Sequence, residues 1–258
     1  MTKEPTTQKP NILILTPVKD AKAHLPCYLA LLDKLDWPRD QISIGMLESD
    51  STDGTWESLE ATKPCLDKRF CNVTLVRRDY GFRMPRGAPR WTPAFQLARR
   101  TILARARNQL LFRALRDEDW VLWLDVDVTD YPTDIIQQLL ATDVDIVHPH
   151  CVKQYGGKTF DLNAWADHGR QRMQDLRGQG LVRLDAVGGT MLLVKADLHR
   201  DGLVFPTFKY GAANTRIRPK HPLWEKGEVE TEGFGIMAMD MGYQCWGLPD
   251  LEIVHADS

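Results

Sequence analysis

The chain has 258 residues, of which 43% are hydrophobic and 26% are charged, so it can bury a sizeable core. Its net charge of -2 excludes a general electrostatic attraction to nucleic acid or to an anionic membrane. The five cysteines are an odd number without a CxxC spacing, which argues against a disulfide framework or a thiolate zinc site. The polar start MTKEPTTQKP has no apolar signal core and no run is long enough to span a membrane, so the sequence predicts a soluble, cytoplasmic protein.

The predicted elements alternate between strands and helices. Residues 1–9 are predicted to form a disordered tail, and residues 10–258 one domain. The apolar run NILILTPV predicts a first strand buried on both faces, as in a parallel sheet. This alternation is typical of an α/β fold with a mostly parallel central sheet flanked by helices. The predicted strands are 11–18, 41–50, 71–79, 119–128 and 144–150, and the predicted helices are 24–37, 51–62, 94–116 and 132–142.

The second half of the sequence is less regular. Residues 181–198 predict two strands joined at Gly188 and Gly189. A helix is predicted to start near Glu232, and LEIVHAD is predicted to be a final strand.

Positive charge is concentrated in residues 77–116, which contain eleven arginines, no lysine and one acid. A solvated helix face explains some of these residues, and the acidity of the rest of the chain argues against nucleic-acid binding. A diphosphate needs only two or three arginines in one cleft. We expect a subset to serve this purpose, with Arg107 and Asn108 as candidates.

Two aspartates follow an apolar run in the stretch VLWLDVDVTD, residues 121–130. In an open parallel sheet, ligands bind beyond the carboxyl ends of the strands, which is where Asp125 and Asp127 are predicted to lie. Two bare carboxylates so close together repel each other, and a divalent cation relieves the repulsion. Oxygen ligands select Mg²⁺ or Mn²⁺, which also bind substrate phosphates. The pair therefore predicts a metal that joins the protein to a diphosphate, with turn formation as the alternative.

The same spelling recurs in TDVDIV, where Asp143 and Asp145 precede a predicted strand. At the amino end of a strand, turn or cap roles are the usual explanation. His148 and His150 in the strand that follows are likewise predicted to be packing or turn residues.

Four further residues have both a functional and a structural interpretation. Asp50 ends the second predicted strand and can accept hydrogen bonds from a base or ribose, or form an Asx turn. His255 ends the last predicted strand as a structural residue or a further metal ligand. Glu230 and Glu232 precede a predicted helix, where they can cap it or orient and deprotonate an acceptor hydroxyl.

Taken together and in order, these motifs resemble those of the Anp1/Mnn9/Van1 family of α-mannosyltransferases, glycosyltransferase family 62. The resemblance covers roughly residues 10–257, and the terminal histidine, DLNAW and ETEG are its most specific parts. The matching stretches are NILILTPV, ESDSTDGT, ARNQLL, WVLWLDVDV, FDLNAWAD, DAVGGTMLLV, GLVFPTFKYG, EVETEGFGIMAMDMGY and GLPDLEIVHAD.

The resemblance implies a GT-A fold and a retaining transfer of mannose from GDP-mannose to a glycan or other hydroxyl acceptor, with Mn²⁺ or Mg²⁺ as cofactor. It places Asp125 at the nucleotide and the metal, and Asp127 and His255 at the metal. The other implied roles are donor binding for Thr16, Pro17, Glu48, Asp50, Arg107 and Asn108, sugar or acceptor binding for Asn163, Trp165, Gly188 and Gly189, and catalysis for Asp161, Glu230 and Glu232.

Fungal members of this family carry a membrane anchor and work in complexes. This chain shows neither anchor nor stem, so we expect a compact, cytosolic, bacterial version with at most peripheral association with a glycan-assembly complex. Two alternatives stay open: an inverting GT-A transferase that uses a UDP-sugar with Glu232 as general base, and a non-catalytic sugar-nucleotide-binding or scaffold subunit. A nucleotidyltransferase is disfavoured, because TPVKD lacks the glycine-rich phosphate loop expected after the first strand.

Overall fold

A computed structural model of the protein describes residues 9–85, 92–211 and 227–256. The predicted disordered tail lies outside the described residues except for Lys9, and so does part of the arginine-rich loop before the long helix. The strands are β1 (Ile12–Val18), β2 (Ile42–Glu48), β3 (Asn72–Arg77), β4 (Trp120–Leu124), β5 (Val128–Asp130), β6 (Ile146–Val152), β7 (Trp165–Ala166), β8 (Gln171–Arg172), β9 (Val182–Leu184), β10 (Met191–Lys195) and β11 (Cys245–His255).

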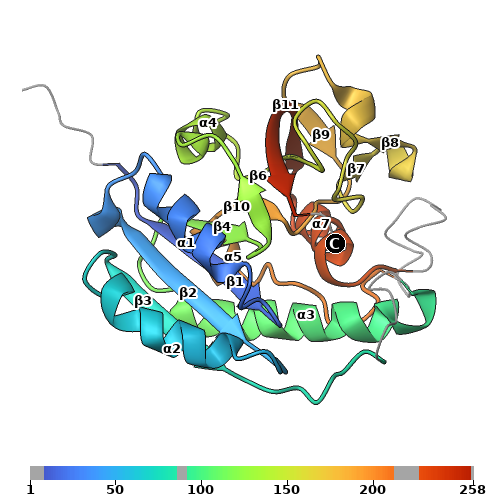
Figure 1. The fold of residues 1–258 in the computed structure, drawn as a ribbon. Coiled ribbons are helices and arrows are strands. Elements are labelled where there is room, and N and C mark those ends of the chain that lie inside the picture. Colours follow the sequence, from blue (N-terminus) through green and yellow to red (C-terminus); the bar gives the residue numbers. More distant parts are fainter. Residues whose placement is uncertain (1–8, 86–91, 212–226, 257–258) are drawn as a thin grey trace, which may run out of the picture.

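The helices follow the strands in alternation, and the longest of them runs along the sheet (Figure 1). Across the described residues, no helix is long and apolar enough to cross a bilayer. The helices are α1 (Leu25–Lys34), α2 (Thr55–Leu66), α3 (Pro93–Ala114), α4 (Ile135–Leu140), α5 (Ala196–Arg200) and α7 (Glu230–Asp240), with short 3₁₀ turns at Arg39–Gln41, Asp167–Gly169 and Met173–Leu176.

The large sheet has the strand order β3-β2-β1-β4-β10-β6-β11-β5, and β9 pairs with β11. Strands β1 to β4 pair in parallel, as do β6 and β11. Strand β10 is antiparallel to both of its neighbours, β4 and β6, and β5 and β9 are antiparallel to β11. The predicted α/β fold with a mostly parallel central sheet is therefore confirmed, with three antiparallel additions.

Apolar side chains cover both faces of the sheet, which explains the continuous hydrophobic runs of β1 and β4. Alternate residues of β1 point to opposite faces: Ile12 and Ile14 pack in one cluster with α1, α2 and α4, and Leu13 and Leu15 pack in another with α3, α5 and the Phe234 side chain of α7. The sheet is thus the middle of three layers (Figure 1).

Two details differ from the predicted elements. Strand β4 ends at Leu124 rather than near residue 128, so Asp125 and Asp127 lie in the turn between β4 and β5. Strands β9 and β10 flank Gly188 and Gly189 as predicted, but they pair with β11 and with β4 and β6 instead of with each other. Because β10 is antiparallel to β4, its first residues lie at the same edge as the carboxyl ends of β1, β2 and β4. This edge carries the site.

Candidate active site

A cavity of about 570 Å³ opens at the carboxyl edge of the parallel strands. Its walls come from the segments after β1 and β2, from the segment 82–84, from the first half of α3, and from the turn after β4. Pro17, Asp50 and Asp125 contribute to it, as do the arginines Arg83 and Arg99. A cavity of this size at a sheet edge, with carboxylates on one side and guanidinium groups nearby, is suited to an anionic ligand of nucleotide dimensions.

Asp50 shapes one wall of this cavity. It adopts a left-handed backbone conformation (φ 55°) after β2 and is 4% exposed. Its carboxylate accepts the backbone N–H groups of Tyr80 at 3.1 Å and of Gly81 at 2.9 Å. Lys19 donates to the carbonyl oxygens of Asp50 and Phe82, at 3.0 and 3.1 Å. The short Asp50 side chain therefore fixes the segment that follows β3 against the loop that follows β2.

The two aspartates after β4 and the histidine that ends β11 are brought to the same place by the pairing of β5 with β11. His255 is opposite Val128 in that pairing, and its Nε2 lies 2.9 Å from Oδ1 of Asp127. The ring of His255 is also stacked on Phe160, with centroids 3.7 Å apart. Burial would lower the pKa of His255, but the Asp127 carboxylate outweighs it and raises that pKa.

Asp125 forms an ion pair with the buried side chain of Arg107. The Nη2 atom of Arg107 lies 3.1 Å from Asp125 Oδ1, and its Nε lies 3.1 Å from Glu230 Oε1. The same Nη2 donates to the carbonyl oxygen of Gly189 at 3.2 Å. Burial and the neighbouring Asp127 carboxylate raise the pKa of Asp125 to about 6, although Arg107 opposes them. Arg107 is 1% exposed, so it connects two halves of the site from inside the protein rather than from the cavity.

Asp161 organises the turn before β10. Its Oδ2 accepts the N–H of Gly189 at 2.9 Å and both the N–H and the hydroxyl of Thr190, at 3.3 and 3.2 Å. A Cβ atom at Gly188 would lie 2.1 Å from Asp161 Oδ2 and 2.5 Å from His148 Nε2, so only glycine fits there. Burial alone would raise the pKa of Asp161, but the His148 ring 3.9 Å away and the backbone donors outweigh it and hold that pKa below its usual range.

The start of α7 carries a second group of carboxylates. Glu230 has a left-handed backbone (φ 56°), is 3% exposed, and accepts from the Thr231 hydroxyl at 2.9 Å. Glu232 accepts from Trp165 Nε1 at 3.0 Å and pairs with Arg100 Nη1 at 2.8 Å. A left-handed backbone is strained in a non-glycine residue such as Glu230 and persists only where surrounding contacts hold it. The ion pair between Arg107 and Glu230 is one such contact.

Comparisons with known proteins show the family of this chain. The Anp1 family model matches residues 1–178 and 168–209. The mannan polymerase complex subunit mnn9 of Schizosaccharomyces pombe is 32% identical over 98% of this chain and 82% of its own length. The mannan polymerase II complex anp1 subunit of the same organism is 30% identical over 96% of this chain and 64% of its own length. The chain belongs to the Anp1 family.

The fold of this Anp1-family chain is also found in a solved structure. The mannosyltransferase PcManGT from Pyrobaculum calidifontis, in complex with GDP-Man and Mn²⁺, superposes with a TM-score of 0.57 at 21% identity. The match covers 97% of this chain and 58% of that protein. The Anp1-family chain therefore shares the GT-A fold of this mannosyltransferase.

The residues of the candidate site suit a divalent ion, although the described residues contain no group of three ready-made ligands. Two carboxylates and an imidazole meet at one edge of the sheet, with Asp127 and His255 in hydrogen-bond contact. The raised pKa of Asp125 reflects burial and like-charge repulsion, which a cation would relieve. Ions such as Mn²⁺ and Mg²⁺ commonly take one or two protein carboxylates and complete their shell with water and substrate phosphates.

The structure gathers most of the sequence-predicted residues around this edge, in two groups. Pro17, Asp50, Asp125 and Asp127 line the cavity, with His255 beside Asp127. The second group lies on the other side of Arg107, around the turn before β10 and the start of α7. In this group, Asn163 Nδ2 lies 3.5 Å from Thr231 Oγ1. Its predicted members are Asp161, Asn163, Trp165, Gly188, Gly189, Glu230 and Glu232.

Three predicted donor-binding residues do not line the cavity. Thr16 is buried and bonded to the Tyr28 hydroxyl at 2.6 Å. Glu48 is buried and accepts the N–H of Ser51 at 2.9 Å. Asn108 is bonded to the backbone of Phe205 through both ends of its amide, at 2.8 and 2.9 Å, and faces away from the cavity.

Three residues that the sequence did not indicate lie among the candidate site residues. Arg100 precedes Arg107 by two helical turns and so lies on the same face of α3, a spacing that could have indicated a pair. His148 was predicted to be a packing residue and is buried, but it also faces Asp161. Glu228 faces Arg100 at 3.8 Å, and burial together with the nearby Glu232 raises its pKa to about 7. No sequence pattern marks Glu228 apart from its acidic neighbours.

Proposed function

We propose that this protein transfers mannose from GDP-mannose, with retention of configuration and with Mn²⁺ or Mg²⁺, to a hydroxyl group of a glycan. The observation that carries the proposal is the bridge made by Arg107 between the cavity with its Asp125 and Asp127 carboxylates and the carboxylates at the start of α7. The GDP-Man and Mn²⁺ bound by PcManGT support the donor and the ion. The mannan polymerase names of the relatives support mannose transfer and peripheral association with a glycan-assembly complex.

In the donor half of the site, Asp125, Asp127 and His255 are the residues that would hold the ion. When bound, such an ion neutralises the charge that develops on the departing diphosphate. Arg83 and Arg99, which line the same cavity, supply guanidinium donors suited to phosphate oxygens. The Asp50 carboxylate lines the cavity, and its remaining lone pairs can accept hydrogen bonds from a ribose or base group.

In the acceptor half, each predicted catalytic carboxylate is held by neighbouring groups. Asp161 accepts from the Gly189 and Thr190 backbone, Glu230 from Arg107, and Glu232 from Arg100 and Trp165. These contacts favour positioning over nucleophilic attack. They support a same-face reaction, in which the acceptor oxygen bonds to C1 as the C1–O bond of the donor breaks and the leaving diphosphate takes the acceptor proton.

The donor is tested by thermal unfolding with GDP-mannose and UDP-sugars, each with and without Mn²⁺. A ligand that binds only the native state at 100 times its Kd adds about 2.7 kcal/mol of stability. For a chain of this size, that corresponds to a rise in Tm of roughly 5–10 °C. We expect this rise with GDP-mannose and Mn²⁺ together. A rise with a UDP-sugar alone would favour the inverting alternative, and binding without turnover would favour a scaffold subunit.

The metal assignment has a matched control within the chain. Asp127→Asn is expected to abolish metal-dependent turnover, whereas Asp145→Asn changes the second copy of the DVD spelling and should leave turnover intact. Asp145 pairs with Lys195 at 3.5 Å far from the cavity, and both side chains are 47% exposed. Full turnover in the Asp127 variant would remove this residue from the mechanism. The anomeric configuration of the product, read by NMR, tests retention, and a β-linked product would contradict it.

A further inference from the structure

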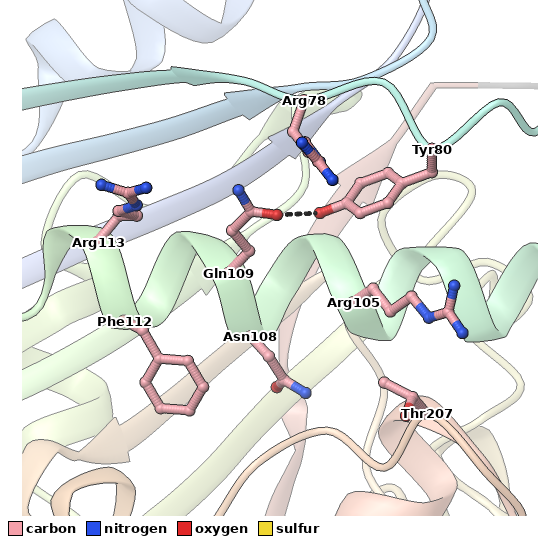
Figure 2. Close-up of a pocket in the computed structure, with 8 residues that line it drawn as sticks. All are labelled: Arg78, Tyr80, Arg105, Asn108, Gln109, Phe112, Arg113 and Thr207. Atoms are coloured by element: carbon pink, nitrogen blue, oxygen red, sulfur yellow. Dashed lines mark hydrogen bonds between the residues drawn. The ribbon is translucent and has the colours of Figure 1, made fainter.

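A second hollow lies on the outer face of α3, away from the proposed donor cavity (Figure 2). Its volume is about 630 Å³. Arg105, Gln109, Phe112 and Arg113 line it from α3, and Arg78 and Tyr80 line it from the segment after β3. The Tyr80 hydroxyl donates to Gln109 Oε1 at 2.9 Å, which ties this segment to the helix.

The three arginines of this groove have no acidic partner among the described residues. Within the part of the chain that the structure describes, no carboxylate lies within ion-pair distance of Arg78, Arg105 or Arg113. Burial raises the pKa of the Tyr80 hydroxyl, and the positive charges of Arg78 and Arg105 oppose this rise. Other arginines of the same segment do have carboxylate partners: Arg77 with Glu48, Arg100 with Glu232, and Arg107 with Glu230.

The groove and the donor cavity are separate but adjacent. The segment 78–84 forms a wall of both: Arg78 and Tyr80 face the groove, whereas Phe82, Arg83 and Met84 line the donor cavity. The two hollows share no lining residue. A ligand in the groove would therefore lie outside the donor site and leave it accessible.

The chemistry of the groove indicates its ligand. Guanidinium groups bind phosphate through paired, charge-assisted hydrogen bonds, and Arg78, Arg105 and Arg113 place three such groups along the groove. A hollow suits a discrete ligand better than a flat lipid surface does. The ring of Phe112, whose residue is 69% exposed, offers an apolar face at the rim. We propose that this groove is a second binding site, for a phosphorylated sugar that is either free or part of a glycan.

The test is calorimetric titration of glucose 6-phosphate into the whole protein, with glucose and inorganic phosphate as comparison ligands. We expect saturable binding of glucose 6-phosphate that is weaker for phosphate and absent for glucose. Arg105→Gln combined with Arg113→Gln should raise its Kd at least tenfold, because two charge-assisted contacts are lost. Arg170→Gln combined with Arg183→Gln removes the same charge from exposed positions elsewhere and should leave the Kd unchanged.

Three results would overturn the proposal. The first is the absence of glucose 6-phosphate binding by the native protein. This includes the case in which the protein does not bind the sugar phosphate but sediments with phosphatidylglycerol vesicles. The second is equal affinity in the groove double variant, shown by circular dichroism to be folded. The third is loss of binding in Asp127→Asn, which would place the ligand in the donor cavity. Binding that persists in Asp127→Asn but is lost in Phe112→Ser and in the double variant supports the groove, whatever donor the enzyme uses.

Discussion

Replacing Arg107 by methionine tests whether the buried guanidinium holds the two halves of the site together. Methionine keeps much of the volume but removes the contacts to Asp125, to Glu230 and to the Gly189 carbonyl. Breaking a buried ion pair on one side costs about 3–5 kcal/mol, because a charge is left without its partner. The Glu230 side chain is 4% exposed and meets this condition, whereas that of Asp125 is 26% exposed and can regain water. We therefore expect a loss near the lower limit, about 3 kcal/mol.

The loss is measured as the free energy of unfolding in urea, and it corresponds to a fall in Tm of roughly 6–12 °C for a chain of this length. Arg113→Met is the control on the same helix, because its side chain is exposed and such substitutions stay within about 0.5 kcal/mol. Glu230→Gln in the Arg107→Met background should recover part of the loss, since the buried charge is then gone. If Arg107→Met is as stable as Arg113→Met, the proposed bridging role of Arg107 is wrong.

Two further outcomes follow from the site. Gly188→Ala should cost about 3 kcal/mol and most of the activity, because its Cβ overlaps the Asp161 carboxylate. Gly178→Ala, where no atom is within 4 Å of the added Cβ, should lose only about 1 kcal/mol to its positive φ. Glu228 has a pKa raised from 4.5 to about 7, so the native state binds its proton more tightly and stability falls as pH rises between these values. Glu228→Gln should remove this fall in urea titrations at pH 5 and 8, and equal pH dependence in both proteins would contradict the assignment.

The parallel half of the fold could be predicted because its strands are buried on both faces. Such strands read as unbroken apolar runs between helices with polar faces, and their carboxyl ends must meet at one edge. The direction of β10 could not be predicted in this way. A strand buried on both faces has the same apolar pattern in either direction, and its neighbours are selected by packing with residues far away in the chain.

Candidate site residues could be predicted where a motif directly follows a predicted strand. They could not be predicted where a helix supplies an ion-pair partner from a distant part of the chain. Asp125 and Asp127 were predicted at this edge from their position after a parallel strand, and the resemblance added His255, which the structure places beside Asp127. Arg107 was expected in the cavity as one of the arginines that could bind a diphosphate. Its two carboxylate partners come from segments that the sequence separates widely, so only the folded chain shows that Arg107 can be desolvated.

The contact between Asp127 and His255 depends on a small piece of sheet. Strand β5 has three residues and pairs with only the last part of β11, at the edge of the sheet. Short edge segments open locally at much lower free energy than the core of a domain. Amide hydrogen exchange at β5 and at the end of β11 should therefore be faster than at β1 and β4. It should slow when a bound ligand contacts both Asp127 and His255. Occupancy of the donor site would then be visible as protection of backbone that the ligand never touches.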